Sequence, residues 1–162
     1  MSSKFEHSVN YPFPVATLWA LISTEQYWRD LLQATNAEHG SLESFAINGD
    51  EVTVVTKQGV GAENLPSVVT AVRPGDVEIP RTIDFRLVGD VIAGTMNASV
   101  SGAPAKIRGD INIAGNPAVA QYSGEADVSI PFVGGKIEKA IIEQVSQLLD
   151  AERDATVDFQ QG

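Results

Sequence analysis

One long amphipathic helix in the last quarter of the chain constrains the fold more than any other feature. From Gly135 to Phe159 the sequence has no proline and no further glycine, which leaves room for roughly 37 Å of helix at about 1.5 Å per residue. Apolar residues recur there every three or four positions and form a single stripe: Ile137, Ile141, Val145, Leu148, Ala155 and Phe159. Such a stripe must be buried against another element, so the rest of the chain has to supply an apolar surface.

Most of the remaining sequence shows the two-residue period of half-buried β-strands. The first strand is expected between Lys4 and Tyr11. The later ones are expected at Gly40–Asn48, Glu51–Gln58, Val77–Val88, Val91–Ser101, Ala105–Ala114 and Ala118–Ile130. Turn-forming sequences such as Asn48-Gly49-Asp50 and Gly89-Asp90 separate successive strands. Tight turns of this kind predict an antiparallel meander.

Two short helices are expected between the first two strands. Pro14 suits the first turn of one helix, and Ser23 or Thr24 is the expected N-cap of the other. Their apolar sides consist of Val15, Leu18, Trp19 and Ile22 in the first helix, and Tyr27, Trp28, Leu31 and Leu32 in the second. A further short helix is expected from Leu65-Pro66-Ser67 through Val72, and it is either a lid over an opening or an ordinary connection.

Together these elements predict an α+β helix-grip fold in one domain of residues 1–162. A curved antiparallel sheet of about seven strands is expected to wrap around the long C-terminal helix, with two short helices after the first strand. The length of 162 residues is ordinary for a single domain. No internal repeat, low-complexity tract or linker divides the sequence.

Composition narrows the classes of function. The formal net charge of −10, with basic residues scattered, disfavours binding to nucleic acid or anionic lipid surfaces. No apolar run approaches the roughly 18 residues of a membrane span, and no signal peptide is evident, so we expect a cytoplasmic protein. With no cysteine and only His7 and His39 as histidines, we predict neither a metal site nor a cofactor. Gly134-Gly135 fits a tight strand-to-helix turn better than a phosphate-binding loop.

Three segments resemble an uncharacterised bacterial START-like family: Glu25–Arg29 (EQYWR), Pro74–Thr82 (PGDVEIPRT) and Pro131–Lys139 (PFVGGKIEK). The likeness spans nearly the whole chain, and the order of elements is similar to the START and Bet v 1-like superfamily (SRPBCC, polyketide cyclase-like). This resemblance implies a helix-grip fold with a cavity for lipids, sterols, polyketides or other hydrophobic molecules between sheet and helix. It implies no catalytic residue, because no family motif supplies one.

Three polar side chains stand where the pattern requires apolar ones: His7, Arg81 and Glu152. Buried charge is costly unless it is paired. One interpretation is therefore an Arg81–Glu152 pair, with His7 nearby, that orients the polar end of a ligand. The alternative, which we favour at this point, is that each residue lies near an open end of the sheet and reaches water.

Six further residues complete the predicted ligand-binding set, because strand alternation or the helical stripe turns them inward: Trp28, Phe85, Met96, Tyr122, Val145 and Leu148. Trp28 is either part of a cavity mouth or a core anchor, and the core is the more usual place for such an aromatic. Several inward positions carry small residues: Gly94, Ala98, Gly109, Ala118, Ala120, Gly124 and Ala126. These either leave room for a ligand or let the terminal helix approach the sheet closely.

The leading hypothesis is a binding or carrier protein for a hydrophobic small molecule, driven by burial of apolar surface. One alternative is an enzyme of the cyclase, dehydratase or hydrolase kind, which needs His7, Arg81 or Glu152 at the cavity with a shifted pKa. Another is a regulatory protein that acts through its acidic surface and has a vestigial cavity. Neither the ligand nor the oligomeric state can be read from the sequence.

Overall fold

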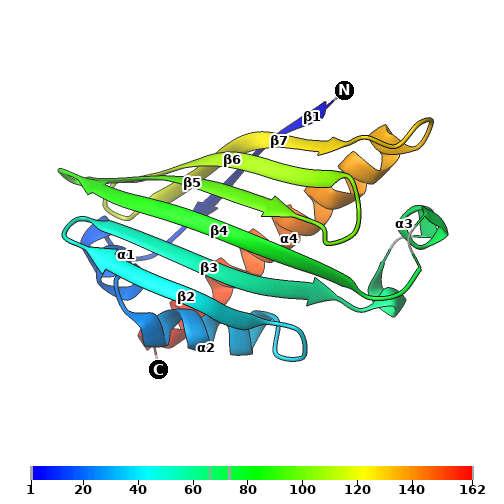
Figure 1. The fold of residues 1–162 in the computed structure, drawn as a ribbon. Coiled ribbons are helices and arrows are strands. Elements are labelled where there is room, and N and C mark those ends of the chain that lie inside the picture. Colours follow the sequence, from blue (N-terminus) through cyan, green and yellow to red (C-terminus); the bar gives the residue numbers. More distant parts are fainter. Residues whose placement is uncertain (1, 66, 73, 162) are drawn as a thin grey trace.

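The turns between successive strands produce the meander that the sequence predicts. In the computed structural model, which describes residues 2–65, 67–72 and 74–161, seven strands form one antiparallel sheet in the order β1-β7-β6-β5-β4-β3-β2 (Figure 1). Their bounds are β1 Ser2–Asn10, β2 Ser41–Asn48, β3 Glu51–Val60, β4 Val77–Val88, β5 Val91–Ser99, β6 Ala105–Ala114 and β7 Val119–Val128. Gly49 and Gly89 have φ values of 61° and 60°, which the tight turns between strands require.

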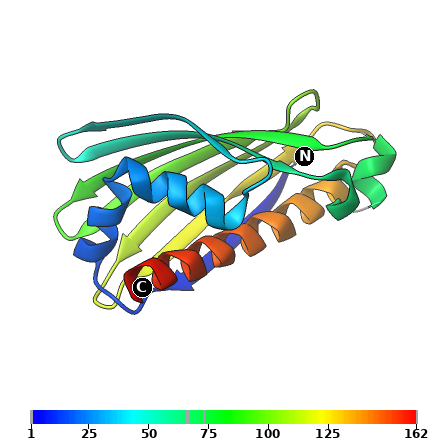
Figure 2. The same cartoon turned by 90° about the horizontal axis from the view of Figure 1, so that it is seen from below.

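The helices cover the side of the sheet toward which it curves. Their bounds are α1 Val15–Ile22, α2 Glu25–Thr35, α3 Ser67–Val72 and α4 Gly134–Gln161, with a 3-10 turn at Ala62–Asn64. Figure 2 shows α4 running along the length of the sheet, with α2 beside its C-terminal half and α3 near its other end. The helix-grip arrangement expected from the sequence is therefore present. No helix in the described part of the chain is long and apolar enough to cross a membrane.

Several boundaries differ from the expected ones by about two residues, which is the usual uncertainty at element ends. β3 continues beyond Gln58 to Val60. β5 ends at Ser99, and the Val100 N–H donates to the Ala105 carbonyl in the turn that follows (3.1 Å). The short helix α3 lies where it was expected, and Pro66, in its expected start, lies outside the described residues.

The expected side-chain cap of α2 is absent. Thr24 does precede the helix with an extended backbone, but neither its hydroxyl nor that of another residue caps α2. The Thr24 hydroxyl instead donates to the Ala20 carbonyl at 2.9 Å. This bond directs the hydroxyl back toward α1, and no side chain accepts from the first N–H groups of α2, so the predicted cap is wrong.

Aromatic packing fills the end of the fold at which α1, α2 and the C-terminal half of α4 meet. The Trp28 ring stacks on Phe85 with centroids 6.0 Å apart. The Tyr27 hydroxyl donates to Thr156 Oγ1 at 2.7 Å, because Thr156 already donates to the Glu152 carbonyl. Toward the other end of α4 the contacts are aliphatic and fewer. The two halves of the interior are thus filled very differently.

The first turn of α4 is tied to the sheet by a buried carboxylate. Glu138 is only 2% exposed and accepts hydrogen bonds from Ser3 Oγ at 2.6 Å and from the Val128 N–H at 2.9 Å. These two bonds lower the pKa of Glu138 from its ordinary value, against the opposing effect of burial. One side chain thereby joins α4 to both β1 and β7.

This carboxylate should make stability depend on pH. Because its pKa is lowered in the folded state, Glu138 contributes full stabilisation above its unfolded pKa, near 4.5, and loses it as the pH falls through the lower folded value. We expect Glu138→Gln to lower the free energy of unfolding at pH 7, and the difference from the parent protein to shrink below about pH 4.5. Urea unfolding at a series of pH values measures both. Glu143→Gln, an exposed position on the same helix, is the control, and an E138Q deficit that is constant with pH would contradict the prediction.

The small residues of the inward face serve two purposes. Gly124 on β7 lies opposite Gly109 on β6 and Phe5 on β1. A Cβ at Gly124 would overlap the Arg108 carbonyl oxygen and lie 2.6 Å from the Gly109 Cα. The Phe5 ring lies over Gly109, 3.6 Å from where its Cβ would stand. These glycines therefore make room for neighbouring strands and a ring, whereas Ala98 borders a cavity.

Gly124→Ala should consequently destabilise the fold. The added methyl group meets backbone atoms that cannot move aside, so we expect a loss of about 1–3 kcal/mol, as for other overpacked sites. Gly135→Ala is the matched control: a Cβ there meets nothing within 4 Å, and alanine favours the helix. Urea unfolding should show a loss for G124A and none for G135A. Equal stabilities of the two variants would mean that the close approach of β6 and β7 is unimportant.

Candidate ligand-binding cavity

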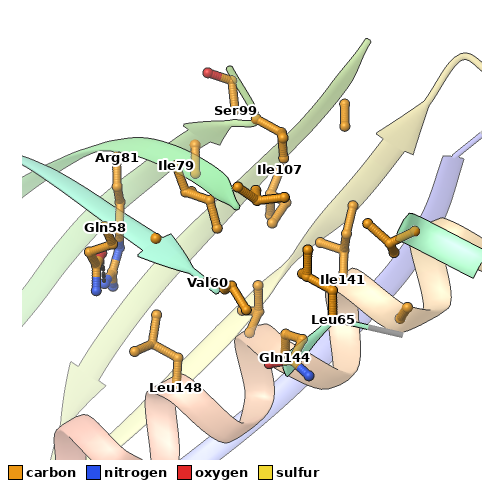
Figure 3. Close-up of a pocket in the computed structure, with 18 of the residues that line it drawn as sticks. Gln58, Val60, Leu65, Ile79, Arg81, Ser99, Ile107, Ile141, Gln144 and Leu148 are labelled. Atoms are coloured by element: carbon orange, nitrogen blue, oxygen red, sulfur yellow. Dashed lines mark hydrogen bonds between the residues drawn. The ribbon is translucent and has the colours of Figure 1, made fainter. Parts of the chain in front are cut away.

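A cavity of about 490 Å³ lies between the sheet and α4 (Figure 3). Its walls come from β3 to β7, from α4 and from the segment around α3, and they are predominantly apolar. Ile79 and Ile107 face it from the sheet, and Ile141 and Leu148 face it from α4. The volume lies within the range of roughly 300–1,000 Å³ that is typical of small-molecule sites.

The cavity exists because two parts of the sheet are covered by side chains of different size. Near α2, large aromatic rings fill the interior. Near the N-terminal half of α4, the sheet presents small residues such as Ala98 and Ala105. The helix packs mainly against β1 and β7 at one edge of the sheet. Short side chains and an off-centre helix together leave the space over β3 to β6 incompletely filled.

A buried ion pair lies at one end of the cavity. Arg81 on β4 is 5% exposed and donates from Nη1 to Glu152 Oε2 at 2.8 Å and from Nη2 to Glu152 Oε1 at 3.3 Å. Arg81 Nε points to Met96 Sδ at 3.2 Å. Burial lowers the pKa of the Arg81 guanidinium, but the neighbouring Glu152 carboxylate outweighs this, so the pKa is raised overall. The guanidinium therefore stays charged, and both carboxylate oxygens are engaged with it.

A second, smaller cavity of about 30 Å³ lies on the aromatic side of Arg81. Tyr11, Tyr27 and Tyr122 border it, together with Glu152. Burial raises the pKa of all three phenols, which therefore remain neutral at physiological pH. The volume suffices for a single water molecule. Arg81 borders both cavities and so lies between the small space beside the three phenols and the larger apolar one.

The large cavity opens to solvent between the α2–β2 loop and α4. Among its lining residues, Glu38 and His39 in the loop are exposed, as are Gln147 and Ala151 on α4. Leu65, next to the 3-10 turn, and Val69 on α3 also line it. The connection between β3 and β4 thus forms part of the cavity wall. Both expected roles of this segment, a lid and an ordinary connection, are compatible with that position.

The structure distributes the nine predicted site residues over three places. Arg81, Met96, Val145 and Leu148 line the large cavity. Trp28, Phe85, Tyr122 and Glu152 border the small one, together with Arg81. His7 belongs to neither set of lining residues. Whether the residues of the large cavity contact a ligand remains a prediction.

The structure bears on three sequence-based interpretations. Arg81 and Glu152 do not reach water at an open end of the sheet: they pair with each other, and their side chains are 6% and 13% exposed. His7 is not part of that pair. Its Nε2 lies 2.7 Å from Oδ1 of Asp150, an exposed residue of α4. Trp28 is a core anchor rather than a mouth residue, since its Nε1 donates to the Ile22 carbonyl in the interior.

Sequence reasoning missed Gln58, which is 5% exposed and lines the large cavity beside Arg81. Its position follows from alternation along β3, where Val52, Val54, Thr56 and Gln58 all face inward. A polar residue at the end of a row of inward-facing side chains could therefore have indicated a cavity residue from the sequence alone. Its contact with Arg81 depends on the β3–β4 register, in which Thr56 lies opposite Arg81 and Gln58 lies two pairs further along, opposite Ile79.

A seven-stranded antiparallel sheet around a long terminal helix, with a cavity between them, defines a START/Bet v 1-like helix-grip protein. A START superfamily protein from Mycobacterium smegmatis matches with a TM-score of 0.53 at 12% identity, over 93% of this chain and 94% of that one. Norcoclaurine synthase from Thalictrum flavum matches with a TM-score of 0.53 at 15% identity, over 99% and 97% of the two chains. At these identities the likeness establishes the fold alone.

Sequence comparison places the chain more narrowly. It belongs to the family described as "Protein of unknown function (DUF2505)", whose profile matches residues 6–159. An uncharacterized protein of Mycobacterium tuberculosis is 31% identical over 172 aligned residues, which span 96% of this chain and 95% of that protein. The expected membership in an uncharacterised bacterial START-like family is therefore confirmed.

The ion pair yields a quantitative prediction. Arg81→Met leaves the Glu152 carboxylate buried without its cation, and we expect a loss of about 3–5 kcal/mol in the free energy of unfolding. Arg81→Met combined with Glu152→Met should restore much of it, because neither charge is then left unpaired. Arg86 lies on the same strand as Arg81, and Arg86→Met, which breaks its exposed contact with Glu51 on β3, should cost less than about 1 kcal/mol. Urea unfolding measures all three, and equal losses for R81M and R86M would refute a structural role of the buried pair.

Proposed function

We propose that this protein binds or carries a hydrophobic small molecule, lipid-, sterol- or polyketide-like, in the large cavity. The main support for this proposal is a space of about 490 Å³, lined mainly by apolar side chains, within an otherwise packed domain. Protein interiors normally pack as densely as organic crystals. A cavity of this size therefore forfeits many contacts that a ligand of matching shape would restore.

The energetics favour an apolar occupant. Each Å² of apolar surface that a ligand removes from water contributes about 25 cal/mol, before the entropic costs of binding are subtracted. Apolar walls such as those formed by Ile79, Ile107 and Ile141 offer such a molecule a good environment. The mouth near Glu38 and Gln147 provides a route of entry from solvent.

Proteins that share the fold support the proposal. One structure of norcoclaurine synthase is in complex with dopamine and hydroxybenzaldehyde, and one of dicamba monooxygenase is bound to 3,6 dichlorosalicylic acid. These ligands belong to those proteins. They illustrate that the architecture accommodates small organic molecules, and the ligand class proposed for this chain comes from its own cavity.

The two alternatives from the sequence have less support. The enzyme hypothesis needs His7, Arg81 or Glu152 as a reactive group at the cavity, yet His7 lies outside its walls, and Arg81 and both oxygens of Glu152 are engaged with each other. The regulatory hypothesis requires a filled, vestigial interior, whereas the space beside Ala98 is incompletely filled. A cytoplasmic location and the absence of nucleic-acid binding stay predictions.

Filling the cavity should abolish ligand binding. Diphenylhexatriene, a neutral hydrocarbon whose fluorescence rises in apolar surroundings, is a suitable probe, and we expect the parent protein to bind it. Ala98→Phe places a ring in the cavity and should weaken binding about 10-fold or more. Ala93→Phe is the matched control, because Ala93 is exposed on the outer face of the same strand. Fluorescence titration measures the affinities, and circular dichroism confirms folding of both variants.

Two outcomes would contradict the proposal. The first is that diphenylhexatriene does not bind the parent protein. The second is that folded A98F and A93F bind it equally well, because the probe would then occupy a different surface.

A further inference from the structure

The amide of Gln58 has a donor that no described residue satisfies. Gln58 Oε1 accepts hydrogen bonds from Thr56 Oγ1 at 3.3 Å and from Arg81 Nη1 at 3.4 Å. The amide nitrogen, Nε2, makes no hydrogen bond to a described residue, and it is not among the side-chain atoms that are sealed from solvent without a partner. The side chain is nonetheless 95% buried and forms part of the cavity wall, since its residue is only 5% exposed.

The orientation of this amide follows from its neighbour. A guanidinium only donates hydrogen bonds, so the oxygen of Gln58 and not its nitrogen must face Arg81. Figure 3 shows Gln58 and Arg81 side by side at one end of the cavity, with Ile107 and Ile141 further along. The NH₂ group is consequently the end of the amide that is not bonded to Arg81, in a residue that lines the cavity.

Another amide on the same wall shows the contrast. Asn36 donates from Nδ2 to the Gly59 carbonyl and accepts from the Gly59 N–H, both at 3.0 Å. Its polar atoms thus hold the α2–β2 loop against β3. Gln58, in contrast, forms hydrogen bonds to described residues only through its oxygen. A ligand that covers this donor without supplying an acceptor leaves it unpaired, which costs about 1–3 kcal/mol, so a ligand with an acceptor at this point is favoured.

The charge balance at this end of the cavity determines which acceptor fits. The charge of Arg81 is neutralised by Glu152, whose two oxygens it already binds. A carboxylate or phosphate brought here would lose its hydration without gaining an unpaired cation, and it would lie near the Glu152 carboxylate. A neutral carbonyl, ester or hydroxyl oxygen incurs no such cost.

We propose that Gln58 is a specificity-determining residue that donates a hydrogen bond to a neutral oxygen acceptor at one end of an otherwise apolar ligand. This inference rests on the proposed function and adds that one end of the ligand is polar and lies beside Gln58. Arg81 and Glu152 act as positioning residues, because they hold the Gln58 oxygen and thereby aim its NH₂ group. The apolar part of the ligand lies along the cavity toward Ile107 and Ile141.

Three compounds of similar size test the inference by displacement of diphenylhexatriene: benzophenone, which has a carbonyl, diphenylmethane, which has no acceptor, and diphenylacetate, which is an anion. We expect benzophenone to bind the parent protein about 2- to 10-fold more tightly than diphenylmethane, the effect of one net hydrogen bond. Diphenylacetate should bind most weakly of the three.

Two substitutions remove the donor in different ways. Gln58→Leu removes both polar atoms, and Gln58→Glu keeps oxygen acceptors for Thr56 and Arg81 but has no N–H. Both should abolish the preference for benzophenone while diphenylhexatriene still binds. Gln144→Leu is the matched control, because Gln144 lines the cavity from α4, where it is half-buried. Its preference should equal that of the parent protein.

The outcomes separate this inference from the function on which it rests. If diphenylhexatriene and all three compounds fail to bind the parent protein, the proposed function is wrong and the role of Gln58 falls with it. If they bind but benzophenone has no advantage, or keeps it in Q58L and Q58E, only the role of Gln58 is wrong. Tightest binding of diphenylacetate would also overturn it, since the site would then recognise an anion.

Discussion

The buried ion pair between Arg81 and Glu152 connects the middle of the sheet to the terminal helix, and much of the architecture depends on it. Arg81 projects from β4, near the centre of the strand order, and meets the helix at 2.8 Å. Removing either partner would leave a charge in the interior, which costs far more than the intact pair contributes. The pair therefore acts less as a source of stability than as a constraint on where α4 lies. It also divides the interior into an aromatic core and an apolar cavity.

The helix is tied to the sheet at two places, and the cavity lies between them. Glu138 holds the first turn to β1 and β7. Farther along, Glu152 meets Arg81, and Thr156 meets Tyr27. The stretch between these ties presents Ile141, Val145 and Leu148 to the cavity. Because polar contacts hold both ends, the apolar middle of α4 does not have to pack tightly on the sheet to stay in place. Unfilled space can therefore persist beneath it.

The fold was predictable from the sequence, whereas the site was predictable only in part. The alternation in β4 and the stripe of α4 reproduce those elements almost to the residue, because period and turns are local properties. The patterns also singled out Arg81 and Glu152 as polar residues on inward faces. Their pairing depends on distances across the fold, which no local pattern contains. The same limit left the alternatives for Trp28 and His7 open: alternation assigns a face, but not which end of the interior a side chain occupies.

Gln58 illustrates how these constraints combine. A guanidinium fully engaged by a carboxylate carries no net charge into the cavity, but it still orients whatever accepts its remaining hydrogen bonds. The Gln58 oxygen is that acceptor. The uncharged NH₂ group of the same residue, which lines the cavity, has no described protein partner. The ion pair that fixes the position of α4 thus also neutralises this end of the cavity, where the remaining donor is the uncharged amide of Gln58. For the apolar ligand proposed here, a neutral donor discriminates between candidates without the desolvation cost that an exposed arginine would impose on them.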